Sequence, residues 1–168
     1  PDQVRLEVSD RIAVITLDRP EQGNAFTQVM RRQLVEALRT ADVDDDVRVV
    51  ILTGAGRHFC VGADLSGNDP AKPFAYQGAG QSDAASVPET ISGVPRDGGG
   101  VVTLELAAMR TPTIAAINGA AVGVGVTMTL PCDIRIASDR ASFGVPFMKL
   151  GIIPGDGGSW LLPRNIGY

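Results

Sequence analysis

Short apolar runs of strand length alternate along this chain with segments of helical composition, and this alternation most restricts the folds available to it. Residues 47–53 and 113–117 are almost continuously apolar, as expected of strands that are covered on both faces. Residues 101–110 and 123–130 read as helices, and residues 133–138 as a further strand. Strands that alternate with helices predict an α/β fold with largely parallel pairing.

The N-terminal part predicts a hairpin followed by an amphipathic helix. Two β-branched runs flank Ser9 and Asp10, and Pro20 closes the second run, which is the pattern of two antiparallel strands. Thr27 is the predicted N-cap of the helix. One face of this helix carries apolar residues at helical spacing, namely Met30, Leu34, Ala37, Leu38 and Ala41.

Composition and charge exclude several classes of function. The 168 residues suffice for one domain, the net charge is −4, and no cluster of Lys and Arg indicates a nucleic-acid surface. No apolar run reaches membrane-spanning length, and the chain opens without a signal or transit pattern, so we expect a cytoplasmic protein. His58 is the only histidine; this excludes a multi-histidine zinc site, and no metal is expected. Cys60 and Cys132 are expected to be reduced thiols that behave as small buried hydrophobic residues.

The segment 66–100 separates the two halves of the pattern. It is rich in Gly, Ser, Pro and Ala and has almost no periodicity, which is unusual inside a compact domain. Two interpretations remain open from the residues, a mobile lid over a site or simple disorder. We treat residues 1–168 as one domain that contains this flexible segment.

Glycines follow two of the predicted buried strands. The strand at 47–53 leads to the turn Gly62-Ala63-Asp64, and the strand at 113–117 leads to a helix that starts near Gly123-Val124-Gly125. Helix N-termini present unpaired N–H groups, and two such groups from neighbouring loops can hold a developing oxyanion. The alternative is that these glycines only allow helices to pack close to strands.

Several motifs, taken in order, resemble those of the enoyl-CoA hydratase/isomerase (crotonase) family: RPEQGNAFT, VVILTGAGRHFCVGADL, PTIAAINGAAVGVGVTMTLPCDIRIAS, ASFG and KLGIIPGDGGSWLLPR. The resemblance covers nearly the whole chain apart from residues 66–100. It implies a crotonase-like spiral of ββα units and an acyl-CoA thioester substrate, with coenzyme A as part of the substrate and no separate cofactor.

The same resemblance implies an oxyanion hole for the thioester enolate, formed by the backbone N–H groups of Ala63 and Val124. Val124 stands where the family usually has glycine, which leaves the N–H in place while the branched side chain narrows the pocket. The implied substrate contacts are Asn24, Ala25 and Phe26 near the entry, and the loop residues Ala63, Asp64, Leu65 and Ser66.

The resemblance also shows where hydratases of the family carry two catalytic glutamates. At those two positions this chain has Thr127 and Phe147. Neither side chain can serve as a general acid or base at neutral pH. The two-glutamate hydratase mechanism is therefore not available to this chain.

Asp156, in the turn IIPGDGGSW, is the nearest candidate acid or base. Isomerases of the family place a single acid or base on this turn one residue earlier, where this chain has Gly155. One carboxylate beside an oxyanion hole suffices to move a proton between C2 and C4 of a 3-enoyl thioester. The alternative is that Asp156 caps the helix expected to start near Ser159; the two roles are compatible.

We therefore expect an acyl-CoA-processing enzyme of the enoyl-CoA hydratase/isomerase type, as in fatty acid metabolism, with isomerase-like proton transfer rather than hydration. A non-catalytic acyl-CoA-binding protein that has lost the hydratase glutamates is the alternative. Thioester hydrolysis is a weaker third possibility, because it needs a carboxylate at one of the two vacant positions.

Two further expectations concern the C-terminal part. Family members continue beyond the LPRNIGY motif into a helical region that caps the acyl site and builds trimers, and this region is apparently absent here. The resemblance implies a homotrimer or a dimer of trimers for a full-length protein, and we expect the 168 residues alone to associate. Trp160 is expected in the core.

Overall fold

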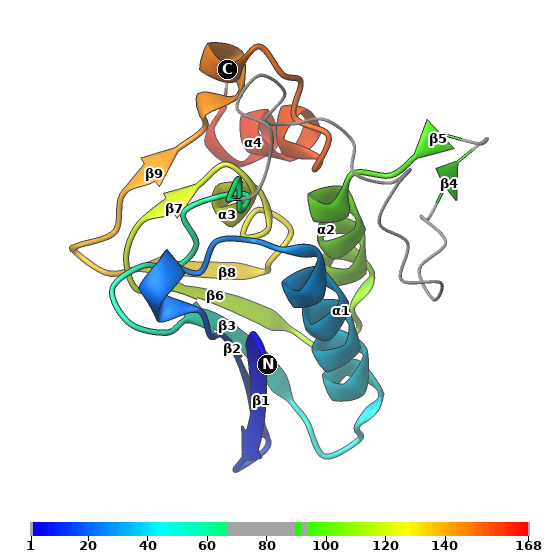
Figure 1. Ribbon diagram of the computed structural model, residues 1–168. Coiled ribbons are helices and arrows are strands. Elements are labelled where there is room, and N and C mark those ends of the chain that lie inside the picture. The colour runs from blue at the N-terminus through cyan, green and yellow to red at the C-terminus, as the bar shows by residue number, and fades with distance from the viewer. Residues whose placement is uncertain (1, 67–89, 92–93, 168) are drawn as a thin grey trace.

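The computed structural model describes residues 2–66, 90–91 and 94–167. Its centre is a five-stranded sheet in the order β1-β2-β3-β6-β8 (Figure 1). β1 and β2 are antiparallel, whereas β2, β3, β6 and β8 run parallel to one another. The strands are β1 (Val4–Ser9), β2 (Ile12–Leu17), β3 (Val49–Gly54), β6 (Thr113–Ile117) and β8 (Ile134–Ala137). The predicted α/β fold with largely parallel pairing is confirmed.

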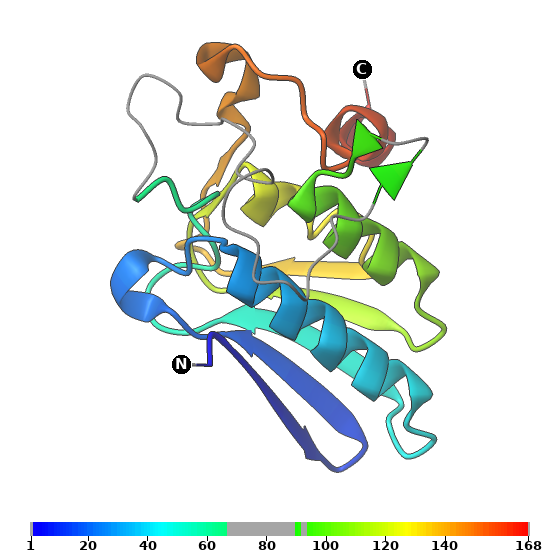
Figure 2. The ribbon, with the colours of Figure 1, turned by 45° about the vertical axis from the view of Figure 1, so that its right-hand side comes forward.

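Two helices, α1 (Gln28–Val43) and α2 (Gly98–Ala108), lie side by side on one face of this sheet (Figures 1 and 2). The Thr27 hydroxyl accepts a hydrogen bond from the N–H of Met30, so Thr27 is the N-cap as predicted. The five residues of the predicted apolar stripe are the buried residues of α1. They pack against β2 and β3, where Ile15 and Leu17 of β2 and Val50 of β3 are fully buried.

Most of the remaining elements lie above the sheet in Figure 1. They are the parallel pair β7 (Ala121–Val122) and β9 (Phe143–Gly144), α3 (Val124–Thr127), η3 (Pro146–Leu150) and α4 (Gly158–Ile166). The short helix η1 (Pro20–Gln22) follows β2 at the left of the view. α3 touches α2, α4 and β7. It is a single turn rather than the longer helix expected at 123–130, because residues 128–131 continue as turns and Pro131 cannot extend a helix.

Most of the segment predicted to be flexible, 66–100, lies outside the described residues. In the described part, β4 (Thr90–Ile91) pairs with β5 (Val94–Pro95), and α2 already begins at Gly98. Regular structure therefore starts before residue 100. The interpretations as a lid and as disorder stay predictions.

Trp160 was expected in the core, and this is wrong. Its side chain is 63% exposed, and the guanidinium carbon of Arg164, one helical turn later, lies 3.2 Å from the centre of its ring. Gly158 forms the buried side of α4, so Trp160 falls on the opposite face and pairs with a cation there. By contrast, Cys60 and Cys132 are both buried and free, as expected.

Candidate functional site

The two loops that carry Ala63 and Val124 lie side by side. Cys60 and Ala121 form a parallel bridge. Along it, the N–H of Cys60 donates to the carbonyl of Ala120 at 3.1 Å, and the N–H of Val122 donates to the carbonyl of Cys60 at 2.9 Å. These bonds place the start of α3 beside the loop that follows β3.

This close approach depends on glycine at position 125. A Cβ atom added at Gly125 would overlap the carbonyl oxygen of Cys60 and lie 3.0 Å from its carbonyl carbon. Gly62, with φ +107°, contributes on the opposing loop, where a Cβ would lie 3.3 Å from the carbonyl oxygen of Val122. The glycines in these motifs therefore allow close packing, as the simpler interpretation proposed. They also bring together the two loops that carry the expected donors, Ala63 and Val124.

Neither expected N–H donor is used in the bridges between these loops. Phe26 forms a parallel bridge with Ala63. The N–H of Phe26 donates to the carbonyl of Gly62, and the carbonyl of Phe26 accepts from the N–H of Asp64. Along an extended segment successive N–H groups point to opposite sides, so the N–H of Ala63 points away from Phe26. Val124 is the first residue of α3, and the N–H of a first helical residue has no intrahelical acceptor.

The side chain of Val124 packs against the start of α2. It is 8% exposed, and a Cβ added at Gly99 would lie 2.7 Å from one of its methyl groups. Glycine at the start of α2 therefore makes room for a branched residue at the start of α3. That the branched side chain of Val124 narrows the pocket stays a prediction.

Asp156 lies where three helices meet. Its side chain is 3% exposed, and a Cβ added at Gly99 of α2 would lie 3.0 Å from the Asp156 Cβ. One carboxyl oxygen, Oδ2, accepts a hydrogen bond from the hydroxyl of Thr127 in α3 at 2.6 Å. The other, Oδ1, accepts from the N–H of Gly158, the first residue of α4, at 3.2 Å. Asp156 is not the N-cap of α4, since that position is Gly157 and it makes no side-chain cap hydrogen bond. The bond from Gly158 is a local turn bond to the residue before the cap, and it occupies one of the two oxygens.

Burial raises the pKa of the Asp156 carboxyl group above its ordinary value. The hydrogen bonds from Thr127 and Gly158 oppose this by favouring the ionised form, and the negative charge of Asp97 at the N-cap of α2 adds to the increase. A carboxylate with a raised pKa is a stronger base than an exposed one.

The two positions where family hydratases carry glutamate lie in α3 and in η3. Thr127 ends α3 and is fully buried. Phe147 belongs to η3, and a Cβ added at Gly123 would lie 3.9 Å from two atoms of its ring. The chain thus places a hydroxyl and an aromatic ring, and no titratable group, at these two positions.

The implied substrate contacts divide into a buried group and an exposed group. Asn24 is fully buried with φ +57°, and its amide is bonded to the backbone of three residues. Ala25 and Phe26 are each 9% exposed. Leu65 is 41% exposed and Ser66 is exposed. Ala63 is also exposed, whereas Asp64 is partly buried. The loop 63–66 is therefore the accessible part, and contact with a ligand stays a prediction for both groups.

Asp64 orders the accessible loop. Its Oδ2 lies 2.9 Å from Nη1 of Arg19, and its Oδ1 accepts from the N–H and the hydroxyl of Ser66. Partial burial acts to raise the pKa of Asp64, but the hydrogen bonds from Ser66 and the charge of Arg19 outweigh it and lower that pKa below its ordinary value. The sequence motif did not reveal Arg19, which reaches this loop from the segment after β2.

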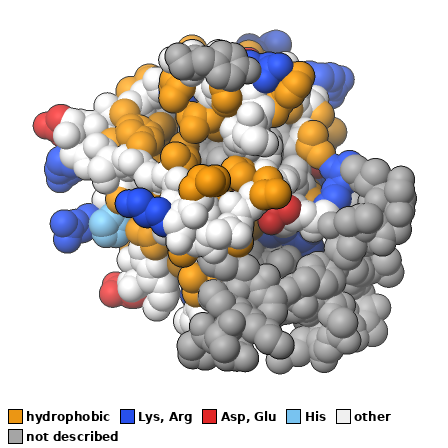
Figure 3. Space-filling view, turned by 90° about the horizontal axis from the view of Figure 1, so that it is seen from above, with side chains coloured by type: hydrophobic (Ala, Val, Ile, Leu, Met, Phe, Trp, Pro, Cys, Tyr) orange, Lys and Arg blue, Asp and Glu red, His pale blue; other side chains and the backbone are white. Residues whose placement is uncertain are grey.

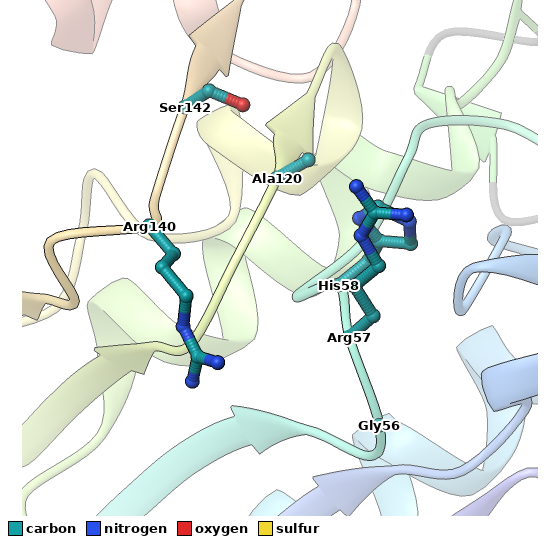
Figure 4. A pocket seen from close by; sticks show the side chains of 6 residues that line it. All are labelled: Gly56, Arg57, His58, Ala120, Arg140 and Ser142. Carbon is teal, nitrogen blue, oxygen red and sulfur yellow. The ribbon is translucent and has the colours of Figure 1, made fainter.

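A separate pocket of about 450 Å³ lies beside the loop after β3. Arg57 and His58 line it from that loop, and Arg140 and Ser142 line it from the segment between β8 and β9 (Figure 4). None of the predicted site residues lines this pocket. Sequence reasoning missed it, since only the fold brings Arg57 and Arg140 together.

Two classes of site find no support in the described residues. Within residues 2–66, 90–91 and 94–167, no group of three or more His, Cys, Asp or Glu side chains is arranged to hold a metal ion. Over the same part of the chain, no helix is long and apolar enough to cross a membrane.

Comparison with known proteins adds a second line of evidence. The sequence model described as enoyl-CoA hydratase/isomerase matches residues 7–168. A Mycobacterium tuberculosis protein named "Probable enoyl-CoA hydratase" is 42% identical over an alignment of 171 positions, which covers 99% of this chain and 59% of that protein. The 1,2-epoxyphenylacetyl-CoA isomerase of Escherichia coli is 41% identical over 162 residues, 95% of this chain and 56% of that enzyme.

A solved structure agrees with these sequence matches. The crystal structure of an enoyl-CoA hydratase from Bacillus anthracis superposes with a TM-score of 0.77 at 31% identity, covering 99% of this chain and 59% of that one. The chain thus spans less than two thirds of the length of the relatives and of this structure.

Proposed function

The chain belongs to the enoyl-CoA hydratase/isomerase family, and from this premise we propose that it binds an acyl-CoA thioester and catalyses proton transfer of the isomerase kind rather than addition of water. The observation that carries the proposal is the buried Asp156 carboxyl group, bonded to Thr127 in the helix that Val124 begins.

The proposed reaction moves one proton. Asp156 removes a proton from C2 of a 3-enoyl thioester, which gives a dienolate that still has its C3–C4 double bond. The negative charge on the thioester oxygen of this dienolate is held by the N–H groups of Ala63 and Val124. The protonated Asp156 then returns its proton to C4; this moves the double bond to C2–C3, re-forms the thioester carbonyl and restores the carboxylate.

Two features favour this reaction over hydration. Thr127 and Phe147 cannot activate or deliver water, because neither titrates near neutral pH. The pKa of Asp156 is raised, chiefly by burial, as suits a group that must both accept and return a proton.

The substrate contacts and the assembly are part of the same proposal. Asn24, Ala25 and Phe26, with the loop from Ala63 to Ser66, would flank the CoA part of the substrate, on the strength of the family resemblance. A homotrimer or dimer of trimers would cover the exposed apolar side chains around η3 and α4, where Figure 3 shows hydrophobic atoms at the surface. These side chains are Phe143, Val145, Met148, Leu150, Ile153, Trp160 and Ile166. Sedimentation velocity is the test, and a monodisperse monomer would contradict this part of the proposal.

The first experiment follows 3-enoyl-CoA and saturated acyl-CoA thioesters by proton NMR in deuterated water. Asp156→Asn is compared with the unchanged protein. The control is Asp42→Asn, which removes a carboxylate bonded to the backbone of Arg110 and Thr111, away from α3. We expect deuterium at C2 or C4 and migration of the double bond, both lost in Asp156→Asn and retained in the control.

Other outcomes would overturn the proposal. Undiminished exchange in Asp156→Asn would remove this residue from the chemistry. A 3-hydroxyacyl product would establish hydration, and free CoA would establish thioester hydrolysis. Bound thioester without exchange in any of the three proteins would identify a non-catalytic acyl-CoA-binding protein.

A further inference from the structure

Thr127 uses its hydroxyl group in an unusual way for a helical threonine. Within helices, Ser and Thr hydroxyls commonly bond the carbonyl three or four residues earlier. The Thr127 hydroxyl lies 3.3 Å from the carbonyl of Val124 and 3.4 Å from that of Gly123, both long for an O–H···O bond. Its short contact, 2.6 Å, is to Oδ2 of Asp156 in another segment.

Thr129 provides an internal comparison. It lies two residues further along and is also buried, with 2% exposure. Its hydroxyl donates to the carbonyl of Val126 at 2.7 Å, which is the ordinary local bond. The contact of Thr127 with Asp156 is therefore particular to that pair and not a general property of threonines in this part of the chain.

The contact can be satisfied in both protonation states of Asp156. A hydroxyl group has one proton to donate and can also accept. When Asp156 is ionised, Thr127 donates to Oδ2. When Oδ2 carries a proton, it can donate to the Thr127 oxygen, whose own proton then turns to the carbonyl of Val124. Oδ2 of Asp156 and the Thr127 oxygen thus stay bonded to each other in both states, whereas loss of a buried partner would cost about 1–3 kcal/mol.

Glycines on neighbouring elements hold the pair closely. A Cβ added at Gly158 would lie 2.8 Å from the methyl group of Thr127 and 3.2 Å from Oδ1 of Asp156. A Cβ added at Gly99 would lie 3.0 Å from the Asp156 Cβ. The space around both side chains is filled, so neither can adopt another rotamer without moving the start of α2 or α4.

We propose that Thr127 is a positioning residue for Asp156: its hydroxyl fixes the carboxyl group against α3, whose first residue is Val124, in both protonation states of that carboxyl. The inference rests on the proposed function of Asp156 as the base. Thr127, which stands in place of a catalytic glutamate, would then support proton transfer by Asp156.

The test measures Asp156 directly and independently of turnover. The carboxyl carbons of aspartate are labelled with ¹³C, the Asp156 signal is assigned by its loss in Asp156→Asn, and its titration is followed by NMR. Thr127→Val removes the hydroxyl and keeps the shape, Thr127→Ser keeps the hydroxyl, and Thr129→Val is the matched control. Should Thr127→Val fail to fold, Thr127→Ala removes the same group with a smaller side chain.

We expect the Asp156 titration midpoint to rise by about one pH unit in Thr127→Val, because the bond that favours the ionised form is lost. Thr127→Ser and Thr129→Val should titrate like the unchanged protein. Deuterium exchange into the thioester, measured above the midpoint, should fall about tenfold in kcat for Thr127→Val with KM little changed, corresponding to one lost hydrogen bond.

An unchanged midpoint and an unchanged kcat in Thr127→Val would overturn the inference. An equal effect in Thr129→Val would also overturn it, because the change would then reflect general loss of packing. If the unchanged protein shows no deuterium exchange while the midpoint still moves in Thr127→Val alone, the positioning of Asp156 stands and the proposed proton transfer fails.

Discussion

Replacing Gly125 by alanine is expected to push apart the two loops that carry Ala63 and Val124. The added Cβ would overlap the carbonyl oxygen of Cys60 and lie 3.0 Å from both its carbonyl carbon and its Cβ. Carbon atoms in contact are separated by about 3.5–4.0 Å, so the loops must separate by roughly 0.5–1 Å. The atoms in the way belong mainly to the backbone and cannot rotate aside.

Two effects of this substitution oppose each other. Alanine is favoured over glycine inside a helix by about 1 kcal/mol, whereas overpacking a filled interior costs about 1–3 kcal/mol. The upper end of that range applies, because the clash is mainly with the backbone of Cys60. We expect a net loss of about 2 kcal/mol in the free energy of unfolding, and a fall in Tm of about 4–8 °C for a chain of this size.

The assay combines calorimetric unfolding with titration of an acyl-CoA thioester. The control is Gly144→Ala, because a Cβ at Gly144 would make ordinary contacts of 3.8 Å and 3.9 Å with the Val122 side chain. A separation approaching 1 Å between the loops should lower the deuterium exchange rate by up to about 100-fold. If Gly125→Ala matched Gly144→Ala in Tm and in exchange rate, the close approach of the loops would not be what holds the two N–H groups in place.

Three further outcomes follow from the same structure. Asn24→Ala should lower the free energy of unfolding in urea by about 3 kcal/mol, because it leaves three buried backbone groups without their amide partner and puts alanine at φ +57°; a loss under 1 kcal/mol would refute this. The pKa of Asp64 is lower in the folded state than in the unfolded state. The contacts of Asp64 with Ser66 and Arg19 therefore stabilise the fold fully above the unfolded pKa of about 3.9, and this stabilisation is lost as pH falls through the folded pKa. Asp64→Asn should therefore cost about 1 kcal/mol at pH 7 and almost nothing near pH 2, and a pH-independent difference would argue against the ion pair. Burial raises the pKa of both Cys60 and Cys132 to about 11, so iodoacetamide at pH 8 should label them only in urea, as followed by mass spectrometry; rapid labelling of the folded protein would contradict their burial.

Some features of this protein depend only on residues that are close in sequence. The apolar stripe of α1 and its Thr27 cap were predictable because helical spacing and N-cap chemistry act within a few residues. The positions of β3 and β6 were predictable from their continuous apolar runs. The expected cover on both faces is wrong, because alternate residues of each strand are only partly buried. The motif order also drew attention to the loops that carry Ala63 and Val124, which the structure places side by side.

Other features depend on which distant segments the fold brings together. Thr127 and Asp156 are 29 residues apart, and nothing in either local sequence indicates that one side chain would bond the other. The same is true of Arg19 with Asp64, and of Arg57 with Arg140 across the pocket.

The exposure of Trp160 illustrates the same limit, because its apolar character predicted burial and the orientation of α4 decided otherwise. Local propensities act over one turn or one strand, and they determined the elements of this protein. Burial, ion pairing and the pKa of Asp156 depend on the surfaces that those elements present to one another, and only the tertiary structure decided these.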